Sequence, residues 1–267
     1  MIMATILINY MNLHWNECLA EMLGTAILLF FGTSSIILNF GSSSFLKQLI
    51  TDQTARHFLT GLMFAGTGSL VAISPIGRLS GGHINPAVSF SFWVLKKMQN
   101  RDFIGYVIFQ FIGSAIGSIF AVVFWSNEFR NINGGLTLPG IGFSSLEAFF
   151  AEIAMTFILI TLILIMLSHH RTTRLTPLLV WIVVSTEVLL GYSISGTSLN
   201  PAKNFGPALV LNLWHNQWIY FTAPVIGALL ATSAYRAKIF GSMELMTAKL
   251  FHTPSYRCIF LYCKERH

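Results

Sequence analysis

The 267-residue sequence predicts an all-α membrane protein, in which six transmembrane helices and two half-spanning re-entrant helices form an inverted repeat. Composition is the first of three observations behind this prediction, because 54% of the residues are hydrophobic and only 10% are charged. Soluble domains usually contain about 25% charged residues, so this chain belongs in lipid. The other two observations are a set of long apolar stretches and a duplicated short motif.

Six apolar stretches are long enough to cross a bilayer as helices, which takes about 20 residues each. They are residues 18–39, 56–76, 103–125, 147–167, 175–194 and 217–239. Two shorter apolar stretches, 85–95 and 200–211, would reach only about halfway across as helices. Such half-spanning helices are tolerated only inside protein or along a water-filled cavity.

Each of the two short stretches opens with the tripeptide Asn-Pro-Ala. The copies are Asn85, Pro86 and Ala87, and then Asn200, Pro201 and Ala202. Around them, six of the 11 aligned positions of residues 80–90 and 195–205 are identical. Asparagine is a strong helix N-cap, and proline suits the first helical position. Each copy therefore predicts a polar loop that opens a helix, with an asparagine amide left to donate outward.

The duplication extends over most of the chain. We expect a first repeat at 17–125, a connecting loop at 126–146 and a second repeat at 147–240. Residues 1–16 form an N-terminal segment, and residues 241–267 form a basic tail. Each repeat has three full spans, an odd number, so the second repeat enters the membrane from the opposite side. The two half-helices then point at each other from opposite faces.

The placement of basic residues predicts the orientation. With six spans, 12 of the 16 Lys and Arg residues fall on the side that holds both termini. By the positive-inside tendency, both termini face the cytoplasm of a plasma or inner membrane. Topology thus explains the net charge of +6, and no nucleic-acid partner is expected. Two interpretations of the tail stay open: it lies on an anionic leaflet, or it is a partly ordered cytoplasmic segment.

Other local patterns carry less information. Gly113 and Gly117 have the G-x-x-x-G spacing that allows helix backbones to approach closely in lipid. The three cysteines indicate no disulfide framework, and neither they nor the His169-His170 pair have the spacing of a metal site. No metal or cofactor is therefore predicted.

On these residues, the chain resembles the aquaporin (major intrinsic protein) family from about residue 17 to residue 240. The segments that carry the resemblance are residues 20–25, 80–88, 151–152, 196–202 and 206–208. Two Asn-Pro-Ala motifs in register with six spans are highly specific. The resemblance implies a passive channel in membrane lipid rather than an enzyme, assembled as a homotetramer. Its permeants would be water and small neutral solutes such as glycerol.

The resemblance also implies that the two half-helices meet at the membrane centre. Each helix N-terminus carries about half a positive charge, so two of them facing one pore repel cations, including protons. Asn85 and Asn200 would then donate to a passing water, which could not readily accept the bonds of a proton relay. The alternative is that both asparagines only cap their helices.

The family's narrowest region corresponds to a selectivity filter at Phe64, Val188, Thr197 and Lys203, with Ala65 as the alternative to Phe64. The family almost always carries Arg where this chain has Lys203. Lysine keeps the positive charge but lacks the planar fork of five donors, so the filter's geometry is less fixed. The alternative is that Lys203 points away from the pore.

Three further residues are expected to brace the pore loops. The resemblance implies that Glu21 and Glu152 accept hydrogen bonds from loop backbone N–H groups, and His83 is expected to support its own loop. Glu187 lies in the fifth span, where a carboxyl is costly and functional by default. It either lines the pore or is a protonated or paired core group.

Residues near the second motif bear on the solute. The resemblance implies that Asn204 after Lys203, and Tyr220-Phe221 in the sixth span, favour water over glycerol. It also implies that Lys203 and Val188, where water-selective relatives often carry Arg and His, favour a wider or less polar filter. A glycerol or small-solute facilitator is therefore the alternative function. A coupled transporter built from inverted repeats, or a structural membrane protein, is a more distant one.

Overall fold

The computed structural model describes residues 13–261 and residue 263, and every regular element in that part of the chain is a helix. Six of the described helices are long: α2 (Trp15–Phe40), α4 (Gln53–Ile73), α7 (Asn100–Trp125), α9 (Ser145–Met166), α10 (Thr176–Ser195) and α12 (Gln217–Arg236). Two others, α6 (Pro86–Val94) and α11 (Pro201–Leu211), have nine and 11 residues. At 1.5 Å per residue, each covers about half of a bilayer core.

Short helical turns connect these elements. They are α3 (Phe45–Leu49), α5 (Pro75–Ser80), α8 (Asn127–Asn131), η1 (Asn133–Gly135) and η2 (Thr173–Leu175). The second span was expected to continue to residue 76, but α4 ends at Ile73 because Ser74 caps a new helix that starts at Pro75. Proline is well suited to that first position and breaks the helix before it.

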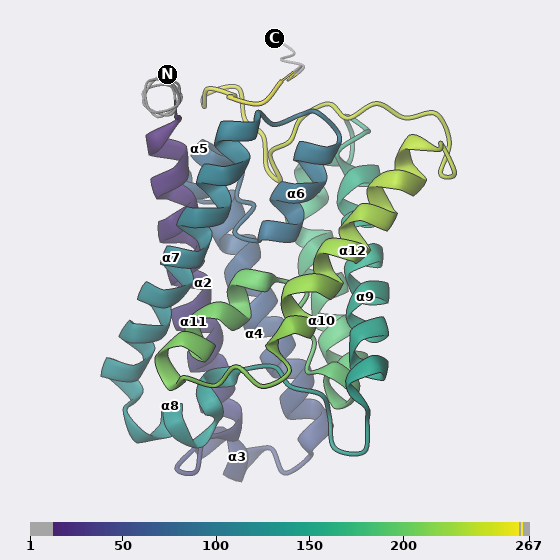
Figure 1. Ribbon diagram of the computed structural model, residues 1–267. Coiled ribbons are helices and arrows are strands. Elements are labelled where there is room, and N and C mark those ends of the chain that lie inside the picture. The colour runs from purple at the N-terminus through teal and green to yellow at the C-terminus, as the bar shows by residue number, and fades with distance from the viewer. Residues whose placement is uncertain (1–12, 262, 264–267) are drawn as a thin grey trace, which may run out of the picture.

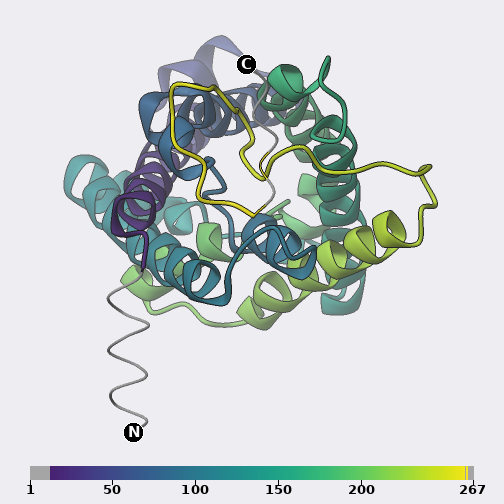
Figure 2. The same ribbon diagram turned by 90° about the horizontal axis from the view of Figure 1, so that it is seen from above.

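The long helices pack in pairs, with α2 along α7, α9 along α12 and α4 along α10. Figures 1 and 2 show them as a bundle around α6 and α11, which enter from opposite ends. The start of α2 and residues 241–261 lie at the same end of the bundle, here called the tail end (Figure 1). The opposite end carries α3 and α8.

Glycines permit the closest helix contacts, and they do so at equivalent points of the two repeats. A Cβ on Gly113 of α7 would lie 2.2 Å from the carbonyl oxygen of Met22 in α2. A Cβ on Gly227 of α12 would lie 2.6 Å from the carbonyl oxygen of Ile153 in α9. Any side chain at either position would force the backbones apart.

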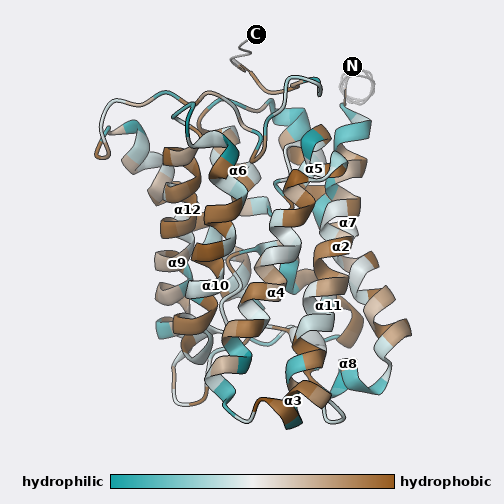
Figure 3. Ribbon diagram, turned by 180° about the vertical axis from the view of Figure 1, so that it is seen from behind, coloured by the Kyte–Doolittle hydropathy of each residue, from teal (hydrophilic) through white to brown (hydrophobic). Residues whose placement is uncertain are grey.

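Five of the described helices are long and apolar enough to cross a membrane by length and composition: α2, α7, α9, α12 and α10 together with η2. The sixth expected span, α4, has 21 residues but does not meet that criterion, because it carries polar and small residues such as Thr60, Gly61 and Ser69. Figure 3 shows apolar residues along the long helices and hydrophilic ones near the ends. Large apolar side chains are exposed on the outer faces, as in Phe120, Val123 and Phe150. A lipid-facing surface accounts for such a patch.

Candidate functional site

Both asparagines of the duplicated motif cap their half-helices. The side-chain oxygen of Asn85 accepts a hydrogen bond from the backbone N–H of Ala87 at 2.9 Å, and Asn200 accepts from Ala202 at 3.0 Å. The prolines Pro86 and Pro201 occupy the first helical positions, where no N–H is needed. The sequence therefore sets the start of each half-helix locally.

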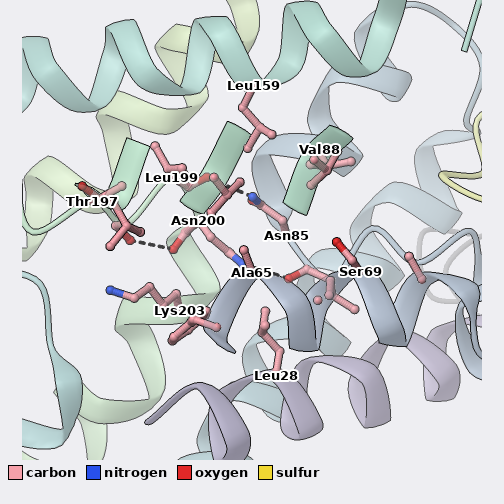
Figure 4. Close-up of a pocket in the computed structure, with 18 of the residues that line it drawn as sticks. Leu28, Ala65, Ser69, Asn85, Val88, Leu159, Thr197, Leu199, Asn200 and Lys203 are labelled. Atoms are coloured by element: carbon pink, nitrogen blue, oxygen red, sulfur yellow. Dashed lines mark hydrogen bonds between the residues drawn. The ribbon is translucent and has the colours of Figure 1, made fainter. Parts of the chain in front are cut away.

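The two half-helices meet through a reciprocal pair of hydrogen bonds. The Nδ2 of Asn85 donates to the carbonyl of Leu199 at 2.9 Å, and the Nδ2 of Asn200 donates to the carbonyl of Ile84 at 2.9 Å (Figure 4). We expected each amide to be free to donate outward. Each instead uses one N–H to hold the opposite loop, which leaves the second N–H of the same amide for another acceptor.

Glu21 of α2 organises the first loop. Its two carboxylate oxygens accept from the backbone N–H groups of His83 at 2.9 Å and Ile84 at 2.6 Å. Ser80 Oγ and Gln110 Nε2 donate to the same carboxylate at 2.6 and 2.7 Å. This network holds Ile84 at a φ of 42°, a conformation that is unfavourable for a β-branched residue.

Glu152 of α9 has the matching position in the second loop. Its oxygens accept from the backbone N–H groups of Ser198 at 2.7 Å and Leu199 at 2.8 Å, and from Ser195 Oγ at 2.8 Å. Leu199 has a φ of 58°, so both loops turn in the same left-handed way before their asparagines. The carboxylates thus satisfy backbone donors that an irregular loop would otherwise leave unpaired inside the membrane.

His83 is fully enclosed between its own half-helix and the tail. Its Nε2 lies 2.8 Å from the carbonyl oxygen of Ala248, and its Nδ1 lies 3.0 Å from Ser89 Oγ. Because the carbonyl can only accept, Nε2 carries the proton and Nδ1 accepts from the serine hydroxyl. The imidazole therefore connects the first half-helix to residues near the C-terminus.

A cavity of about 150 Å³ lies inside the bundle, and both asparagines are among the residues that line it (Figure 4). A water molecule occupies about 30 Å³ of the liquid, so the cavity holds several. All four expected filter residues line it: Phe64, Val188, Thr197 and Lys203. Ala65, the alternative to Phe64, lines it as well.

Lys203 lies beside the cavity and does not point away from it. Its Nζ lies 5.7 Å from the centre of the Phe64 ring, within cation–π range, and the residue is 8% exposed. In Figure 4, Lys203 and Thr197 lie on one side of the asparagine pair, and Ser69 and Val88 lie on the other. Phe64 is therefore the aromatic neighbour of the charge, whereas Ala65 offers no such contact.

Glu187 is buried but is not one of the residues that line the cavity. Neither of its carboxylate oxygens accepts a hydrogen bond from the described part of the chain. Its backbone carbonyl accepts from Thr197 Oγ1 at 3.3 Å, which connects it to the second loop. Glu187 was expected either to line the pore or to be a protonated or paired core group. The structure favours the core position, and no described residue donates a hydrogen bond to its carboxyl group.

Part of the C-terminal segment packs against the bundle, a contact that the sequence had not indicated. Residues 245–250 are buried at the tail end of the bundle, and Leu250 lines the cavity. The Lys249 ammonium donates to the carbonyls of Arg78 at 2.7 Å and Arg257 at 2.6 Å, and burial lowers the pKa of Lys249 to about 8. The acceptors are backbone carbonyls, so the basic and aromatic pattern of the segment could not reveal where Lys249 binds.

One disulfide joins Cys258 and Cys263, which the sequence had not indicated. His252 lies next to it, and the imidazole nitrogen and the two sulfurs lie within 4.8 Å of one another. The spacing Cys-x4-Cys is the only local signal that could have suggested the pairing. Cys18, in α2, is a free buried cysteine.

Comparisons with known proteins agree with this geometry. The sequence model of the family described as "Major intrinsic protein" matches residues 9–235. Aquaporin AqpM of Methanothermobacter marburgensis is 33% identical over 242 residues, which cover 82% of this chain and 96% of that protein. The glycerol uptake facilitator protein-like 6 of Lactiplantibacillus plantarum is 32% identical over 231 residues, which cover 85% of this chain and 98% of that protein.

A solved structure shows the same fold. The aquaglyceroporin from Plasmodium falciparum superimposes with a TM-score of 0.69 and 20% sequence identity, covering 84% of this chain and 96% of that one. The fold class predicted from the sequence is therefore confirmed.

Proposed function

Because the chain belongs to the major intrinsic protein family, a family of membrane channels, we propose that it is a passive channel that conducts water and excludes protons and other ions. One observation carries the proposal: Asn85 and Asn200 face each other from opposed half-helices inside a cavity bounded by the long helices. Proteins of a channel family bind and orient a permeant, so the proposal includes no catalysis.

Water orientation at the centre follows from the asparagine amides. Each Nδ2 has one N–H committed to the opposite loop and one remaining N–H. A water that accepts from both remaining N–H groups has its own hydrogens directed away along the pore, so it cannot accept a proton from a neighbouring water. The N-termini of α6 and α11 add a positive potential at the same place.

Lys203 contributes a second barrier to cations. It is the charged residue of the proposed filter, with Phe64, Val188 and Thr197 as uncharged walls. The aromatic and aliphatic walls cannot replace the hydration shell of an ion, and the ammonium repels cations directly. Neutral molecules meet neither obstacle.

The proposal extends to the bracing residues and the assembly. Glu21, Glu152 and His83 hold the loops that carry the asparagines, and their role is structural. Both termini lie in the cytoplasm, the two repeats are bounded as expected from the sequence, and the protein forms a homotetramer in the membrane. The positive-inside distribution supports the orientation, and the relatives support the channel class.

A glycerol facilitator is the second candidate, favoured by the replacement of the expected filter arginine by Lys203 and by the similarity to a glycerol uptake facilitator-like protein. Stopped-flow light scattering on proteoliposomes separates the two functions. An impermeant osmolyte should give fast shrinkage, and glycerol should give fast shrinkage without rapid re-swelling. Rapid re-swelling in glycerol would assign the chain to the facilitators, and shrinkage no faster than in empty liposomes would refute conduction.

A further inference from the structure

Residues 245–261 form a segment that lies across the tail end of the bundle (Figure 2). Leu250 of this segment lines the cavity. Leu250 donates its backbone N–H to the carbonyl of Gly81 at 2.9 Å, next to the loop that carries Asn85. The ring of Phe260 stacks on His83 with 5.3 Å between centroids. Two separate points of the segment, Leu250 and Phe260, thus touch the first pore loop.

A cluster of metal-ligating side chains lies immediately beside both of these points. His252 follows Leu250 by two residues, and Cys258 precedes Phe260 by two. The nitrogen and sulfur atoms of His252, Cys258 and Cys263 lie within 4.8 Å of one another, and all three residues are half-buried. A small ion can therefore reach them from solvent.

The geometry of the cluster suits a soft tetrahedral cation. Zinc binds thiolate sulfur at about 2.3 Å and imidazole nitrogen at about 2.0 Å, so ligand atoms lie about 3.5–3.8 Å apart. Two thiolates and one imidazole, with water in the fourth position, form a known type of zinc site. The four-residue spacer between the cysteines lets the two sulfurs separate to this distance once their bond is reduced.

We propose that His252, Cys258 and Cys263, after reduction of the disulfide, bind a divalent cation of the Zn²⁺ class and thereby fasten residues 245–261 across the cavity. Reduction by a phosphine or a dithiol supplies two electrons, and each sulfur takes up one proton. Binding of Zn²⁺ then releases both thiol protons. The resulting neutral complex adds no net charge beside the basic residues Arg78, Lys249 and Arg257.

The fastening follows from chain connectivity. The bound ion cross-links residues 252, 258 and 263, and the two contact points, Leu250 and Phe260, lie next to or within the closed loops. Closing these loops lowers the conformational entropy of the undocked segment, so docking is favoured. The disulfide alone closes the loop 258–263 and leaves residue 252 outside it.

Zinc binding is tested on the full-length chain in detergent with a phosphine reductant, by competition for Zn²⁺ with a chromogenic chelator. We expect one ion per chain, and affinity at least about tenfold weaker in Cys258→Ser and His252→Ala. Cys18→Ala and His170→Ala are matched controls that should bind like the unmodified chain. Absence of one-to-one binding, or equal affinity in His252→Ala, would overturn the site.

The fastening is tested by trypsin cleavage after Arg257. Zinc should slow this cleavage at least about twofold in the reduced chain and leave it unchanged in His252→Ala, which also controls for any effect of zinc on trypsin. Equal rates with and without zinc in a chain that binds it would overturn the fastening. Neither readout depends on conduction, so failure of this proposal and failure of the proposed function are distinguishable.

Discussion

At the residue scale, a few side chains connect the backbone to the proposed transport function. Asn85 and Asn200 each cap a helix and hold the opposite loop, so one residue type performs two tasks. Sequence reasoning predicted the caps, because they depend on neighbouring backbone groups. It missed the reciprocal bonds to Leu199 and Ile84, because those depend on how two distant loops approach each other.

Replacement of Lys203 by valine should weaken the exclusion of cations. Two unit charges 4 Å apart repel by about 4 kcal/mol at an effective dielectric constant of 20. If the ammonium raises the barrier to a cation by only a third of that energy, its removal should speed cation passage about tenfold. Ionic current through protein-containing bilayers measures the effect. Lys203→Arg retains the charge and is the control, and an unchanged current in Lys203→Val would remove the proposed role of Lys203.

Replacement of Glu152 by glutamine should destabilise the protein by about 1–3 kcal/mol. Glutamine retains one acceptor oxygen, so either Ser198 or Leu199 loses its partner and leaves a buried N–H unsatisfied. Thermal unfolding monitored by size-exclusion chromatography measures the loss. Glu147→Gln is the matched control, because Glu147 is exposed and glutamine preserves its capping role. Equal losses in both variants would contradict the bracing role.

At the element scale, the half-helices could be predicted well. Asn-Pro encodes the start of each one locally, and the end of the short apolar stretch marks where each one stops. The long helices were predicted within a few residues, because the bounds of each long apolar stretch lie close to the bounds of the helix that it forms. The break between α4 and α5 was not predicted. Its cause, the Ser74 cap followed by Pro75, was present in the sequence but was hidden within a continuous apolar stretch.

Replacement of Gly113 by alanine should separate α7 from α2 and cost about 1–3 kcal/mol of stability. The new methyl group would lie 2.2 Å from a backbone oxygen, which cannot move aside as a side chain can. Gly68→Ala in α4 is the control, because its methyl group would make ordinary contacts at 3.6 Å or more. Thermal unfolding should rank the two variants in that order, and the reverse order would contradict the packing argument.

At the scale of the whole molecule, the duplication, the apolar spans and the two motifs predicted the fold class. The docking of residues 245–261 could not be predicted, because each of its main hydrogen bonds has a backbone carbonyl as the acceptor, and every residue possesses one. The cavity itself is also a property of the assembled bundle, since its lining comes from both repeats and from the C-terminal segment. Candidate lining residues could be named from the resemblance, whereas their mutual placement required the structure.

Osmotic water permeability tests the central claim most directly. Full-length protein in proteoliposomes, with a reductant and a metal chelator present, is compared by stopped-flow light scattering with Val188→Trp, which places a large ring in the cavity. We expect fast shrinkage with the unmodified chain and shrinkage close to that of empty liposomes with the variant. Equal rates for both chains, or no acceleration by the unmodified chain, would contradict a water pore through this cavity.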